Sequence, residues 1–89
     1  MELIILDGAK MTDREAAHAY LAKTMRFPNY YGGNLDALAD CLGELGQSVF
    51  IVLVNPQALT EALGDYGRKM IALFEELSAE PGAFEFRLN

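Results

Sequence analysis

A run of six apolar residues, Val49–Val54 (VFIVLV), constrains the fold of this chain more than any other segment. Its length and its mostly β-branched side chains predict a strand, and the lack of alternating polar residues predicts burial on both faces. A second apolar run, Glu2–Leu6, predicts another buried strand, and the alternation of apolar and charged residues over Ala83–Leu88 predicts a third with one wetter face. Long connections must therefore join three short strands.

Helical patterns fill both connections. Thr12 and Glu15 form a capping box, which predicts the start of a first helix that ends ahead of Pro28. The other predicted helices are a short one capped by Gly33 or Asn34 that ends near Gly43, a brief one over Gln57–Leu63, and a long one over Tyr66–Glu80. Because strands separated by helices need crossover connections, we expect one α/β domain over residues 1–89. It is a small three-stranded parallel sheet flanked by about four helices, packed mainly on one face.

Acidic residues dominate the middle of the chain. Thirteen Asp and Glu against seven Lys and Arg give a net charge of −6, and no Lys or Arg occurs between Phe27 and Gly67. Negative charge disfavours nucleic acid and anionic membranes as partners, because both attract positive charge. Since negative charge also promotes solubility, the net charge alone identifies no partner.

We expect a cytoplasmic protein. The first residues, MELIILDGAK, lack the basic segment of a signal peptide, and no apolar run approaches the roughly 18 residues of a transmembrane helix. The single cysteine, Cys41, can form no internal disulfide, which is usual in reducing compartments. We expect the Cys41 thiol to be buried and reduced, and the only histidine, His18, to have a structural or surface role.

The short second helix has two distinct faces. Leu35, Leu38 and Leu42 lie at the i, i+3 and i+7 positions of a buried stripe. Asp36 and Asp40 lie at i and i+4 on another face, where like charges destabilise a helix by roughly 0.2–0.5 kcal/mol per pair. Spacing alone favours a solvated face, but aligned carboxylates without neighbouring cations also suit a cationic partner.

The segment from Tyr30 to Leu42, YYGGNLDALADCL, resembles the barstar family of intracellular inhibitors of secreted ribonucleases. A looser likeness extends over the whole chain, through a proline before the tyrosines, the apolar second strand and a last helix with Phe74 and Glu76. The resemblance implies a bacterial inhibitor that is no enzyme and needs no cofactor or metal. Its second helix would enter the active site of a basic, barnase-like ribonuclease, either secreted or toxin-type, in place of RNA phosphates. We expect a one-to-one complex and a monomer when free.

The resemblance also assigns partner-binding residues by position. Asp40 is implied to mimic a phosphate among catalytic Arg, Lys and His residues, with Asp36 as a second acidic contact. The other implied contacts are Tyr30 and Asn34 at the start of the helix, Gly43, Glu44 and Leu45 at its end, and Glu76 on the last helix. We expect Tyr30 to be exposed and Tyr31 to be structural. Ala39 and Leu45 stand where barstar has tryptophan, and large aromatic residues usually contribute much of the binding energy of an interface. This leaves open two alternatives: a cognate enzyme with a different surface around its active site, or a partner that is weaker or unrelated.

Two other functions fit parts of the sequence. Asp36 and Asp40 could hold Mg²⁺ through two carboxylates. The chain has no P-loop, no G-x-G-x-x-G motif, no His/Cys cluster and no basic patch for a phosphate, so we expect no enzyme. The acidic face could instead serve as an interaction module for a basic protein that is not a nuclease. A Mg²⁺ titration tests the first alternative, and the identity of the basic partner tests the second.

Overall fold

Three parallel strands form one sheet, as the need for crossover connections predicts. In the computed structural model, which describes residues 1–89, β1 (Glu2–Asp7), β2 (Val49–Val54) and β3 (Glu85–Leu88) lie in the order β1-β2-β3. Both pairings are parallel, and Ile51 of the central strand β2 lies between Ile4 and Phe86. The predicted α/β class and parallel sheet are confirmed.

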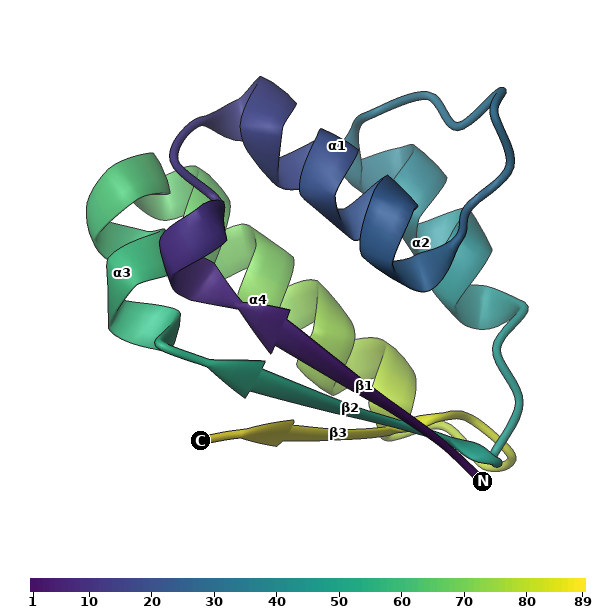
Figure 1. The fold of residues 1–89 in the computed structure, drawn as a ribbon. Helices are drawn as coiled ribbons and strands as arrows, with labels where there is room; N and C mark the ends of the chain where they lie inside the picture. Colours follow the sequence, from purple (N-terminus) through teal and green to yellow (C-terminus); the bar gives the residue numbers. More distant parts are fainter.

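The helices cover one face of this sheet (Figure 1). They are α1 (Arg14–Met25), α2 (Leu35–Gly43), α3 (Pro56–Leu63) and α4 (Asp65–Ser78), and a short 3₁₀ helix, η1 (Gly8–Lys10), follows β1. The core lies between the helices and the sheet. It includes Leu6, Ile51 and Leu53 from the strands and Leu21, Leu38, Met70 and Phe74 from the helices.

The prediction that β2 is buried on both faces is wrong. Val49, Ile51 and Leu53 are buried under the helices, whereas Phe50, Val52 and Val54 on the other face are only half-buried. On the same open face of β1, Leu3 and Ile5 remain 59% and 55% exposed. The reason is topological: both crossovers pass over one face, so no helix of residues 1–89 covers the other (Figure 1).

Three helices have boundaries that differ from the sequence prediction, and the smallest difference is in α3, which begins at Pro56 instead of Gln57. Asp13, not Thr12, caps α1, because Asp13 has extended backbone angles and its Oδ1 accepts a hydrogen bond from the Ala16 N–H at 2.8 Å. The predicted capping box is therefore wrong, because the residue three positions after Asp13 is Ala16, which has no polar side chain to complete such a box. α4 begins one residue earlier than predicted and ends at Ser78. With 14 residues α4 is the longest helix. None of the helices could span a lipid bilayer.

Candidate protein-binding site

α2 is anchored through one face and presents the opposite face to solvent. Asn34 caps it, since its side-chain oxygen accepts a hydrogen bond from the Ala37 N–H at 2.8 Å. Leu38 and Leu42 are 0% and 1% exposed, and Leu35 packs against the core at its edge. Of the two predicted caps, Gly33 and Asn34, the structure has Asn34, and the leucine stripe is confirmed. Together they set the orientation of the acidic side.

Three carboxylates occupy the exposed side of α2 and its end. Asp36 and Asp40 are exposed, and so is Glu44, which follows the helix with near-helical backbone angles. We call these three residues the acidic row. Both ion pairs in the structure involve other residues, one joining β1 to the end of α1 and one within α4. The acidic row is therefore free to accept hydrogen bonds from a cationic partner.

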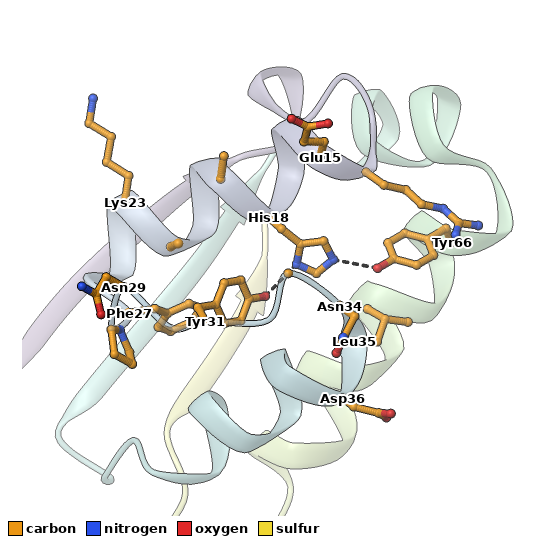
Figure 2. Close-up of a pocket in the computed structure, with 15 residues that line it drawn as sticks. Glu15, His18, Lys23, Phe27, Asn29, Tyr31, Asn34, Leu35, Asp36 and Tyr66 are labelled. Carbon is orange, nitrogen blue, oxygen red and sulfur yellow. Dashed lines mark hydrogen bonds between the residues drawn. The ribbon is translucent and has the colours of Figure 1, made fainter.

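The two tyrosines before α2 occupy different environments. Tyr31 is half-buried, and its hydroxyl lies 2.6 Å from Nδ1 of His18 (Figure 2). Its ring also packs against Phe27, with the ring centroids 4.9 Å apart. Tyr30, by contrast, is 85% exposed. The expected division is confirmed: Tyr31 holds the loop in place, and Tyr30 is accessible.

His18 connects three segments of the chain. It is 4% exposed on α1, and its Nε2 lies 2.6 Å from the hydroxyl of Tyr66 on α4, while its Nδ1 faces Tyr31 in the loop (Figure 2). In a neutral imidazole one nitrogen donates and the other accepts, so the two hydroxyls satisfy the ring in either tautomer. His18 is thus structural and not a surface residue. Local sequence patterns did not indicate its hydrogen-bond partners, which lie 13 and 48 positions away.

Burial sets the protonation states in this cluster. It lowers the pKa of His18 below its ordinary value of 6.5, because the charged imidazolium is poorly solvated there. Burial also raises the pKa of Tyr31, with smaller contributions from Cys41 and Tyr66. At neutral pH the cluster is therefore uncharged, and it fixes the loop through hydrogen bonds and packing rather than through ion pairs.

A groove of about 920 Å³ runs between α1 and the loop that leads into α2 (Figure 2). His18, Tyr31 and Tyr66 line it, and the guanidinium carbon of Arg14 lies 4.1 Å from the centroid of the Tyr66 ring. Asp36 is the one member of the acidic row that lines the groove, and its carboxylate points away from His18 (Figure 2). The groove therefore borders the acidic row and does not enclose it.

Loop and helix residues meet at a smaller hollow of about 250 Å³. Tyr30 from the loop, Asp40 from α2 and Glu44 after it all line this hollow. Two carboxylates beside an aromatic ring form a suitable environment for one cationic side chain, through charged hydrogen bonds and a cation–π contact. The hollow thus joins three of the residues that the sequence assigned to partner binding.

Cys41 also lines this hollow, but its chemistry is that of a structural thiol. It is half-buried rather than fully buried as expected. Burial raises the pKa of Cys41, and the neighbouring Glu44 and Asp40 carboxylates add to the effect. Because the thiolate is the nucleophile, a thiol held neutral in this way is not activated.

The remaining predicted contacts lie beyond this hollow. Gly43 and Leu45 line a third cavity, of about 110 Å³, together with Leu77 and Glu80 from the end of α4 and the turn after it. Glu76 is exposed on α4 but lines none of the cavities beside α2. Glu80 was not among the predicted site residues, since in the sequence it marked only the end of a helix.

The structure gives no support to a metal site. No group of three or more His, Cys, Asp or Glu side chains lies close enough to hold a metal ion. The acidic row and the neighbouring Cys41 are therefore not arranged closely enough to hold a metal ion as a group.

Two comparisons with known proteins both point to ribonuclease inhibitors. The family model described as "Barstar (barnase inhibitor)" matches residues 1–89 of this chain. A protein of Bacillus subtilis (strain 168) named "Putative ribonuclease inhibitor YrdF" is 37% identical over 81 residues, which cover 90% of this chain and 89% of that protein. The likeness seen in the segment from Tyr30 to Leu42 therefore extends over the whole domain.

Proposed function

Since this chain belongs to the barstar family, we propose that it inhibits a basic ribonuclease by placing the acidic row and the tyrosine loop in the enzyme's active site. The family makes it an inhibitor rather than an enzyme. The observation that carries the proposed mechanism is the acidic row itself: exposed, unpaired, and held on a helix whose opposite face is locked in the core.

The chemistry of ribonucleases explains why such a row would block them. A ribonuclease must hold an anionic backbone and stabilise the negative charge that develops during cleavage, so its active site is a cationic pocket. Carboxylates complement that pocket in charge, and they accept bidentate hydrogen bonds from arginine, which are strong and geometrically selective. On this proposal Asp40, which lies in the hollow beside Tyr30, mimics an RNA phosphate.

The other contacts surround this centre. Asp36 and Asn34 extend the contact toward the groove, while Gly43, Glu44 and Leu45 extend it past the end of α2. Glu76 contributes an acidic contact at the edge, from α4. The resemblance implies that Ala39 and Leu45 take the places of tryptophans, so the proposed contact surface lacks two large aromatic anchors. This difference fits an enzyme with a different surface around its active site, and it also fits a weaker or unrelated partner.

The proposed target is a secreted or toxin-type, barnase-like enzyme, bound one-to-one in the cytoplasm. Isothermal titration with barnase, and with any small basic ribonuclease encoded beside the gene, measures stoichiometry and affinity. We expect a ratio of one with a nuclease and no comparable binding to lysozyme, a basic protein that does not cleave RNA. Equal affinity for lysozyme would contradict the proposal and favour a general acidic interaction module.

A further inference from the structure

A second surface of this protein lies on the open face of the sheet, away from the acidic row. Leu3 and Ile5 are 59% and 55% exposed there, and Phe50 and Val52 beside them are half-buried. No helix lies on this side of the strands (Figure 1). Parallel sheets occur almost only where both faces are covered, so an open apolar face on such a sheet is unusual.

Charged residues on β3 border this apolar face. The strand register places Leu3, Phe50 and Glu85 side by side at one level of the sheet. The next level on the same face holds Ile5, Val52 and Arg87. Both charged side chains are exposed, and the Arg87 guanidinium carbon lies 5.7 Å from the centroid of the Phe50 ring. The face thus has an apolar part on β1 and β2 and a border with one acidic and one basic residue.

We propose that a second copy of this chain covers the open face, sheet against sheet, in a symmetric dimer. The two-fold axis lies in the plane between the two sheets, perpendicular to the strands and midway between the two levels. It places Glu85 of each copy opposite Arg87 of the other. The same axis places Leu3 opposite Ile5, and Phe50 opposite Val52. Such a contact is self-complementary, as a two-fold interface must be.

Charge selects this register over its neighbours. A shift that centres the axis on the level of Val52 would place the two copies' Arg87 side chains against each other, and a shift the other way would oppose the two copies' Glu85 side chains. Like charges directly opposed are unfavourable, so these alternatives are disfavoured. The order of the two charges on β3 therefore fits a second copy of the chain specifically.

The size of the face predicts a weak dimer. Six residues at about 3.3 Å each and three strands about 4.8 Å apart give a face of roughly 20 by 14 Å. This is well below the roughly 800 Å² per partner of a standard stable interface. The protein is therefore expected to be a monomer when dilute, as the sequence suggested, and to pair at high concentration. The dimer leaves α2 free, so it is independent of the proposed nuclease complex.

Sedimentation equilibrium from about 10 μM to about 1 mM tests this proposal. Salt at about 0.15 M screens the long-range repulsion between two chains of net charge −6 and affects close contacts less. We expect the average mass of the natural protein to rise toward that of a dimer. A protein that stays monomeric at about 1 mM would overturn the proposal.

Charge-swap variants test the register. E85R and R87E should each weaken pairing about tenfold or more, because each puts like charges opposite one another at two symmetric positions. The double variant E85R/R87E should recover pairing to within about threefold of the natural protein. The matched control E61R makes the same charge change as E85R on exposed α3 and should leave pairing level or slightly stronger. Single variants without effect, or a double variant as weak as the singles, would contradict this dimer. Thermal melts serve as the control that each variant is folded.

Discussion

At the scale of single residues, Asp40 is the side chain on which the proposed inhibition depends most. It lines the hollow with Tyr30 and has no ion-pair partner in the free protein. We expect Asp40→Ala to weaken nuclease binding by about 2–5 kcal/mol, because cationic groups of the enzyme would be left buried and unpaired. Mutants of the barnase–barstar complex are among the cases from which this range is taken. The thermal midpoint should stay level or rise slightly, since the repulsion with Asp36 is relieved. Titration and melting curves of Asp40→Ala and of the control Glu61→Ala check both. A dissociation constant within about threefold of the natural protein's would show that Asp40 is not the central contact.

His18 makes the stability of the free protein depend on pH. Its folded-state pKa is lowered by burial, so the unfolded chain binds the proton more readily. The stability that neutral His18 contributes is complete above its unfolded value of 6.5 and is lost as pH falls through the lowered folded pKa. We expect the free energy of unfolding to decline from pH 7 to pH 5 in the natural protein. In His18→Gln it should be lower at pH 7 but flatter over that range. Urea unfolding at several pH values measures this, and parallel pH curves for the two proteins would contradict the assignment.

At the scale of elements, the cap of α2 supports the binding surface. Asn34 accepts the hydrogen bond of the Ala37 N–H, and loss of such a cap costs about 1 kcal/mol. We expect Asn34→Ala to lower the free energy of unfolding by about that amount and to weaken nuclease binding. Asn34→Asp keeps a capping oxygen and should keep the stability, so its effect on binding isolates the direct contact of the amide. If Asn34→Ala and the natural protein unfold at the same urea concentration, the cap does not stabilise α2.

The elements also show which parts of this fold the sequence can predict. β2, the leucine stripe of α2 and the Asn34 cap follow from local patterns, because strand and helix periodicities and capping act within a few residues. The open face of β2 did not follow from its apolar run, since whether a second layer covers a sheet depends on the path of every crossover. The contacts of His18 with Tyr31 and Tyr66 did not follow either, since they join distant positions of no recognisable spacing. At the site, the charges of the acidic row were predictable, whereas the hollow that joins Asp40 to Tyr30 needed the tertiary structure.

At the scale of the whole molecule, the net charge of −6 acts before contact is made. Long-range attraction to a basic enzyme is screened beyond about 10 Å at 0.1 M salt, while contacts that exclude water are screened much less. We therefore expect higher salt to slow association with the nuclease strongly and to change dissociation little. Stopped-flow association and chase dissociation at several salt concentrations measure the two rates. An association rate that does not respond to salt would mean that the acidic surface does not steer the enzyme.

The central claim is that this protein occupies a ribonuclease active site, and competition with RNA tests it most directly. Initial rates of RNA cleavage are measured at several inhibitor concentrations and at RNA concentrations from below to far above KM, with a weakened variant such as Asp40→Ala so that binding is readily reversible. Active-site occupation predicts that the apparent inhibition constant rises linearly with RNA concentration, doubling when RNA equals its KM, while the maximal rate is unchanged. An inhibition that persists undiminished at saturating RNA would contradict the account, because the inhibitor would then act without displacing the substrate.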